Sequence, residues 1–239
     1  MTPLKPKSVQ ERGEHISASV FTGGPVERFA EVGAMQLATL LLSGLQPNSL
    51  VLDVGCGALR GGYWLLHFLN PDCYYGLEPN REMLEAGLRD LIEEDVLRCK
   101  RPQFDHNDRF DFSVFGRTFD FVLARSMWTH ASKAQIDVML DQFVTWSSPT
   151  GCFLTSYRPA FPRQLRALPA LIPALAENMP PMDDYRDDVW IGRSHQSSEA
   201  GMVQHSYRWI VTECRARRLK VRQLRYPVAQ GQYWLQIRR

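Results

Sequence analysis

Residues 51–57 read Val-Leu-Asp-Val-Gly-Cys-Gly, and this pattern is the strongest indication of the fold. A short apolar run that leads into closely spaced glycines is typical of a buried parallel strand followed by a tight turn. Glycine lets the backbone approach a ligand where a side chain would collide. Asp53 lies near the end of the strand, where its carboxylate can accept a hydrogen bond from a cationic amino group. The stretch therefore predicts a ligand site at the carboxyl end of a strand.

Strand and helix patterns alternate around this stretch. Apolar runs predict strands at 49–54, 73–77, 119–124 and 151–157. Helical spacing of apolar residues predicts helices at 26–45, 62–69, 81–96 and 204–217. The capping-box pattern Ser132-x-x-Gln135 opens a further helix. Two last strands, 221–226 and 232–237, are separated by a short turn, and residues 100–116 carry no clear pattern.

This alternation predicts an α/β fold that is doubly wound, with helices on both faces of a mostly parallel seven-stranded sheet. The closing hairpin predicts that the last strand is antiparallel. We expect residues 1–25 to form an N-terminal arm and residues 26–239 to form a single domain. Six prolines interrupt the pattern after the 151–157 strand, which predicts an inserted lid or substrate segment at about 158–203.

Composition narrows the class of protein. The chain has 239 residues, of which 44% are hydrophobic and 23% charged, as in ordinary globular proteins. A net charge of +2 does not favour nucleic acid or a membrane surface as partner. The five cysteines are dispersed and form no C-x-x-C pair, so we expect no structural zinc and a reduced, cytoplasmic setting. No apolar run reaches the ~20 residues of a membrane helix.

Two further features fall near the ends of the predicted strands. Glu78 lies 23 residues beyond Gly55 and ends the next strand, a position that suits a ribose diol. The segment 105–112 offers Asp108, Asp111 and Phe112 for the edge and face of an adenine. A nicotinamide dinucleotide site would use the same carboxylate, but the glycine spacing is not G-x-G-x-x-G. No Gly-Lys-Ser/Thr follows the turn, which excludes a P-loop.

These residues resemble the class I S-adenosylmethionine-dependent methyltransferase family. Residues 51–57 match its first motif, (V/L)-L-D-x-G-C-G, and Tyr75–Glu78 and Phe119–Val122 resemble its second motif and fourth-strand signature. The likeness covers roughly residues 30–157. Leu59 stands where the family often has a third glycine, and Arg60 follows as a candidate contact for the methionine carboxylate. The resemblance implies S-adenosylmethionine contacts from Asp53, Gly55, Cys56, Gly57, Arg60, Glu78, Pro79, Asn80, Asp111, Phe112, Arg125 and Ser126.

Catalytic candidates follow the fourth and fifth strands. His130 lies where the family usually places its acceptor and is a candidate general base; it can equally stiffen its loop. Tyr157 and Arg158 end the fifth strand, and Arg158 can bind an anionic substrate or pair with a nearby aspartate. The fifth strand ends without a carboxylate, so we expect no metal.

The Asn/Asp-Pro-Pro-Tyr/Phe motif of nucleic-acid amino methyltransferases and the double-glutamate loop of arginine methyltransferases are both absent. We expect a monomer or homodimer that methylates a small molecule, at oxygen first and nitrogen next. A protein or RNA methyltransferase and a non-catalytic cofactor-binding module remain the alternatives.

Overall fold

The computed structural model describes residues 8–159, 203–227 and 232–239. The chain divides into two compact units, Met1–Leu123 and Ala124–Arg239. Most of the predicted insertion, residues 160–202, lies outside the described residues. None of the described helices is both long and apolar enough to cross a membrane.

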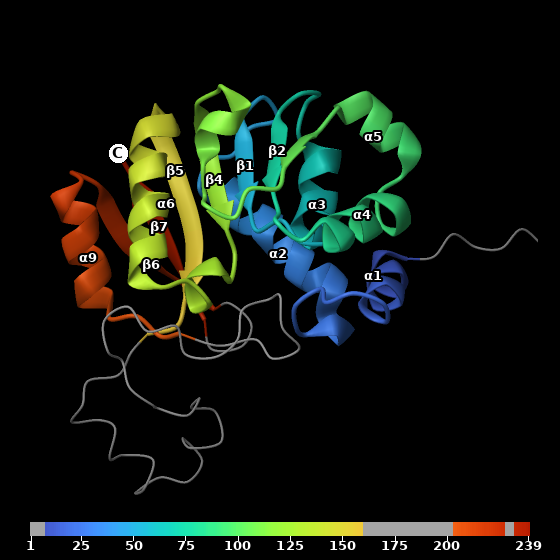
Figure 1. The fold of residues 1–239 in the computed structure, drawn as a ribbon, viewed down its shortest axis with the longest axis horizontal. Coiled ribbons are helices and arrows are strands. Elements are labelled where there is room, and N and C mark those ends of the chain that lie inside the picture. The colour runs from blue at the N-terminus through green and yellow to red at the C-terminus, as the bar shows by residue number, and fades with distance from the viewer. Residues whose placement is uncertain (1–7, 160–202, 228–231) are drawn as a thin grey trace, which may run out of the picture. The chain divides into compact units, whose positions relative to one another are not determined.

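The first unit contains the elements around the glycine turn (Figure 1). Its helices are α1 (Val9–Ser17), α2 (Phe29–Leu42), α3 (Arg60–Phe68), α4 (Arg81–Asp90) and α5 (Glu94–Lys100). Its strands are β1 (Val51–Val54), β2 (Tyr74–Leu77), β3 (Gln103–Asp105) and β4 (Phe119–Ala124), the last residue of which begins the second unit. Short 3-10 helices η1 (Val26–Arg28) and η2 (Phe112–Phe115) complete it.

The second unit follows β4. Its helices are η3 (Met127–Thr129), α6 (Lys133–Trp146) and α9 (Tyr207–Ala216), and its strands are β5 (Ser147–Tyr157), β6 (Lys220–Pro227) and β7 (Tyr233–Arg238). α6 runs along β5 (Figure 1), and Met139 is among the side chains it buries. The predicted capping box is present: Ser132 accepts from the Gln135 amide, and the Gln135 side chain accepts from the Ser132 amide.

The strand order is β3-β2-β1-β4-β5-β7-β6. β1 pairs in parallel with both β2 and β4, and β3 pairs in parallel with β2. β7 runs antiparallel to both β5 and β6. The predicted fold class, a mostly parallel seven-stranded sheet with an antiparallel last strand, is confirmed.

Two parts of the first unit differ from the prediction, and the first of them depends on a residue far away in the sequence. The helix expected at 81–96 is two helices, α4 and α5, separated at Leu91–Glu93. Arg12 of α1 donates to the Leu91 carbonyl at 2.6 Å and to the Glu93 carboxylate at 2.7 Å. A continuous helix would use the Leu91 carbonyl for its own ladder. The sequence also predicts no helix before Val26, whereas Val9–Ser17 form α1, which opens with a capping box.

Candidate functional site

The glycine turn after β1 is tied to the end of β2. Gly55 and Gly57 have φ values of +72° and +56°, in the region that favours glycine. The amides of Gly55 and Cys56 both donate to the Leu77 carbonyl, at 2.7 and 3.3 Å. These bonds hold the turn beside the residue that follows Leu77, which is Glu78.

Glu78 bridges the glycine turn and the start of α4. One carboxylate oxygen accepts from the Gly57 amide and the other from the Asn80 amide, both at 2.9 Å. The residue is only 7% exposed, and burial raises the pKa of its carboxyl. His106 Nδ1 lies 2.7 Å from the Glu78 carbonyl oxygen and so places an imidazole beside this strand end.

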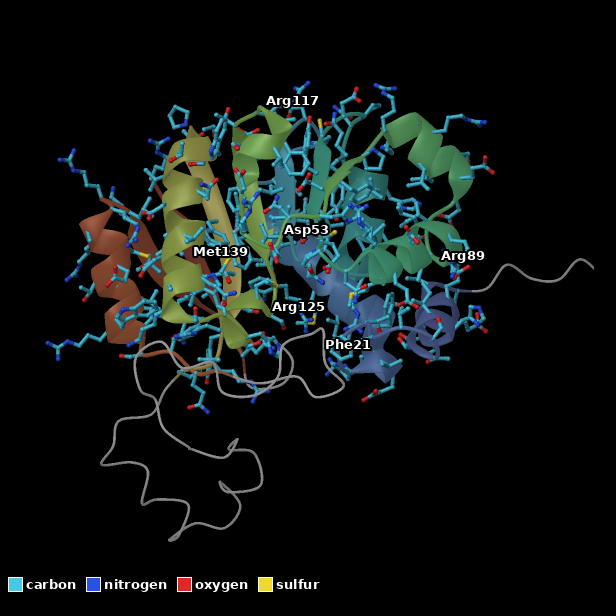
Figure 2. The ribbon with its side chains drawn as sticks, viewed as in Figure 1. Phe21, Asp53, Arg89, Arg117, Arg125 and Met139 are labelled. Atoms are coloured by element: carbon cyan, nitrogen blue, oxygen red, sulfur yellow. The ribbon has the colours of Figure 1, made fainter. Side chains whose placement is uncertain are left out.

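Asp53 is the second buried carboxylate of this unit (Figure 2). It is 4% exposed and accepts a hydrogen bond of 2.8 Å from the Tyr74 hydroxyl. Burial raises its pKa to about 7, and the neighbouring Glu78 charge acts in the same direction. A β-carbon on Gly62 would lie 2.7 Å from the Tyr74 hydroxyl oxygen, so the second glycine of the Arg60-Gly61-Gly62 run makes room for this bond.

The contacts of the Arg60 side chain lie within the protein. Its position in the sequence suggests instead a contact with the methionine carboxylate of the cofactor. Its two terminal nitrogens donate to the carbonyls of Gly23 and Gly24, the latter at 3.1 Å, and its guanidinium lies 4.5 Å from the centre of the Phe29 ring. It is 5% exposed. Arg60 therefore joins the start of α3 to the segment that precedes η1.

The candidate adenine segment is a compact loop. Asp111 caps η2 by accepting from the Ser113 amide at 2.9 Å, and its own amide donates to Asn107. Phe112 is fully buried. Asn80 caps α4 by accepting from the Met83 amide, and Pro79 is exposed. These residues are held by local bonds within the first unit.

The second unit carries the remaining candidates on the loop after β4 and at the end of β5. Ser126 has a φ of +63°, a left-handed conformation rare for a residue other than glycine. His130 ends η3, where its amide donates to the Met127 carbonyl. Tyr157 is buried and donates to Gln223, and burial raises its pKa. The Arg158 carbonyl accepts from the His205 amide.

Several residues at these places were missed by sequence reasoning. Tyr74 and His106 contact the two carboxylate-bearing strand ends, and Ser156 and Gln232 hold the loop after β4. For Tyr74 the sequence held one usable signal, the pair Gly61-Gly62 at the start of a helix. Paired glycines there usually mark a place where another group approaches the helix backbone closely. Among the described residues, no group of three His, Cys, Asp or Glu side chains is arranged to hold a metal ion.

Comparison with known proteins agrees with this arrangement. Magnesium protoporphyrin IX methyltransferase from Synechocystis PCC 6803, solved with bound SAH, superposes with a TM-score of 0.61 at 17% identity over 95% of this chain and 93% of that one. The glycopeptide N-methyltransferase MtfA gives 0.59 at 14% identity, over 94% and 96%. Residues 52–153 match the protein-family model described as a methyltransferase domain. Residues 52–153 therefore resemble a methyltransferase domain in sequence, and the chain shares the fold of these two methyltransferases.

The buried Asp53 carboxyl predicts a specific pH dependence of the stability of the protein. Its folded pKa, about 7, lies above its ordinary value of 3.8. The folded protein therefore keeps a proton that the unfolded chain has lost, and the stability contributed by this group falls as the pH rises from about 4 through 7. We expect the free energy of unfolding of the wild type, relative to Asp53→Asn, to fall by roughly 3 kcal/mol between pH 5 and pH 8.

Urea unfolding of both proteins without cofactor at the two pH values measures this difference. Asp108→Asn, at an exposed position, is the control and should leave the pH dependence of the wild type unchanged. A wild-type-to-Asn difference that stays constant between pH 5 and 8 would show that Asp53 is ionised throughout.

Proposed function

We propose that this protein transfers the methyl group of S-adenosylmethionine to a small-molecule acceptor, at oxygen in preference to nitrogen and without a metal. The observation that carries the cofactor assignment is the pair of buried carboxylates beside the glycine turn. Both Asp53 and Glu78 have pKa values raised by burial. A buried carboxylate is stabilised by hydrogen-bond donors or a cation, which the cofactor offers as a ribose diol and an ammonium group.

Each candidate then has a proposed role. Glu78 binds the ribose hydroxyls, while Asp53 faces the amino-acid end of the cofactor. Gly55, Cys56 and Gly57 let the backbone approach it, and Pro79, Asn80, Asp111 and Phe112 shape the nucleoside side. Arg125 and Ser126 complete the set, and Arg60 supports it indirectly by joining the start of α3 to the segment that precedes η1. The cofactor itself supplies an electrophilic methyl group when bound, so the protein contributes mainly position and orientation.

A hydroxyl acceptor also needs to lose its proton, and we assign that step to His130. The side chain would accept the proton from the acceptor oxygen as the new bond forms, while Tyr157 and Arg158 lie at the end of the neighbouring strand β5. Support for a small acceptor comes from the absent polymer-methylating motifs noted above. The five cysteines are all free of disulfides, in keeping with the proposed cytoplasmic monomer or homodimer.

Replacing His130 tests the mechanism. We expect His130→Ala to lower the turnover number by 10²–10⁴-fold, the usual contribution of a general base, and to change S-adenosylmethionine affinity less than threefold. Transfer of labelled methyl to a metabolite extract identifies an acceptor, after which kcat and calorimetric affinity are measured separately. His67→Ala, an exposed histidine of α3, is the matched control. An unchanged kcat would make His130 a structural loop residue.

Calorimetric titration with S-adenosylmethionine separates the competing functions. Failure of the wild type to bind it would favour a degenerate module of the same fold. Binding without transfer to any acceptor would favour the non-catalytic cofactor-binding module. Binding accompanied by labelling of protein or RNA, rather than of small molecules, would favour a macromolecular acceptor.

A further inference from the structure

The two units carry opposite charge. The first unit has 12 Lys and Arg against 17 Asp and Glu, a net charge of −5, whereas the second has 16 against 9, a net charge of +7. The overall value of +2 conceals this division. A positive unit concentrates anions at its surface and favours an anionic ligand over a cationic one.

In the second unit, every acidic side chain that the structure describes forms an ion pair with the same arginine. Arg217 pairs with Asp137 at 3.2 Å, with Asp141 at 2.6 Å and with Glu213 at 3.0 Å. These three are the only Asp or Glu residues in the described ranges 124–159, 203–227 and 232–239. Each acidic side chain in the described part of this unit is therefore paired with Arg217.

Arg125 is a cation of this unit with no carboxylate partner among the residues that the structure describes. It follows β4 directly, and its Nη2 atom is buried without a hydrogen-bond partner. Desolvation by burial is the one cause that lowers its pKa, to about 10, because no described anion opposes it. Figure 2 labels Arg125 near the end of β4 where η3 begins. A buried guanidinium nitrogen without a partner is costly to the folded state, and a ligand anion would offset that cost.

The backbone that presents Arg125 is held firmly. The Ser126 amide donates to Ser156 Oγ at 2.8 Å, Ser156 Oγ donates to Gln232 at 2.6 Å, and Gln232 Nε2 donates to Ser126 Oγ at 2.9 Å. Thr129 Oγ1 donates to the Ser126 carbonyl at 2.7 Å. This closed network accounts for the left-handed Ser126 and fixes the loop while the neighbouring Arg125 side chain stays unsatisfied.

We propose that Arg125 is an oxyanion receptor that binds a carboxylate or phosphate group of a ligand. The inference rests on the proposed function for the identity of the ligands, and on the second unit alone for the receptor. A planar guanidinium suits either group because it can donate two parallel hydrogen bonds. If the acceptor carries the group, the substrate class is an anionic small molecule.

The test compares the wild type with Arg125→Met and with Arg215→Met, an exposed arginine of α9 that serves as the control. Calorimetry with S-adenosylhomocysteine and with 5′-methylthioadenosine, which lacks the amino acid, reports on the methionine tail. If the charge-assisted bond is to the methionine tail, its loss in Arg125→Met should lower the affinity for S-adenosylhomocysteine by about 10–100-fold. The affinity for 5′-methylthioadenosine should stay unchanged. That result assigns the oxyanion to the cofactor.

The second arm adds phosphate or acetate to protein saturated with S-adenosylhomocysteine and follows the unfolding temperature. If the acceptor carries the oxyanion, S-adenosylhomocysteine binds both proteins equally, and the anion raises the unfolding temperature of the wild type and the control but not of Arg125→Met. Arg125→Gln repeats both arms should the methionine variant not fold. The proposal is overturned if no probe distinguishes Arg125→Met from the wild type. It is also overturned if Arg125→Met loses affinity for both nucleosides by the same factor.

The outcome separates this inference from the proposed function. If the wild type binds neither nucleoside, the cofactor assignment fails, and the anion titration without nucleoside still tests Arg125. A wild type that binds S-adenosylhomocysteine, with Arg125→Met indistinguishable in every arm, leaves the cofactor assignment intact and removes the receptor.

Discussion

Glu78→Ala is expected to lower the affinity for S-adenosylhomocysteine by about 100-fold or more, which corresponds to about 3 kcal/mol. Under the proposed function, the carboxylate accepts two hydrogen bonds from the ribose, and a bond to a charged group contributes roughly 1.5–3 kcal/mol. The same oxygens also hold the amides of Gly57 and Asn80. Removing them loosens the glycine turn as well as deleting the ribose contact.

Two further variants separate these effects. Glu78→Gln keeps the size and one acceptor oxygen, and we expect it to weaken binding by about tenfold. Glu82→Ala, in the exposed first turn of α4, is the control and should bind as the wild type does. Calorimetry of the wild type and the three variants at a single pH measures the affinities. An affinity of Glu78→Ala within threefold of the wild type would move the ribose site elsewhere.

Elements whose signals are local could be predicted from the sequence. The strand before the glycine turn, the strand that ends at Glu78 and the helix after the Ser132 capping box all follow from apolar spacing and caps within a few residues. The parallel register then places Asp53 opposite Gly76, so the two acidic strand ends meet at one edge of the first unit. This is why the glycine turn and Glu78 could be predicted together.

Features that depend on distant partners could not be predicted. Arg12 ends α4 by bonding to a carbonyl 79 residues away, and nothing near Leu91 in the sequence announces this donor. Arg60 binds carbonyls 36 and 37 residues upstream, although its position suggested a ligand. The burial that raises the pKa of Asp53 likewise arises only when the sheet and Tyr74 close around it.

Gly87→Ala is expected to destabilise the protein by about 2–3 kcal/mol, although helix propensity alone predicts a gain of about 1 kcal/mol. Gly87 lies inside α4 and is buried. A β-carbon there would lie 2.6 Å from both the carbonyl carbon and oxygen of Ala58, in the glycine turn. These are backbone atoms, so the clash cannot be relieved by rotating a side chain, and either α4 or the turn must move.

The sign of the change in the free energy of unfolding shows whether the gain in helix propensity or the clash with Ala58 is larger, since the two act in opposite directions. Urea unfolding without cofactor measures it, with Glu85→Ala on the exposed side of α4 as the control that should change stability by less than 0.5 kcal/mol. Because the clash falls on Ala58, beside Gly57, the same methyl group should also weaken S-adenosylhomocysteine binding, which the control should not. If Gly87→Ala is more stable than the wild type, the glycine turn can move away from the added methyl group at little cost. Packing against α4 would then not fix the conformation of the turn.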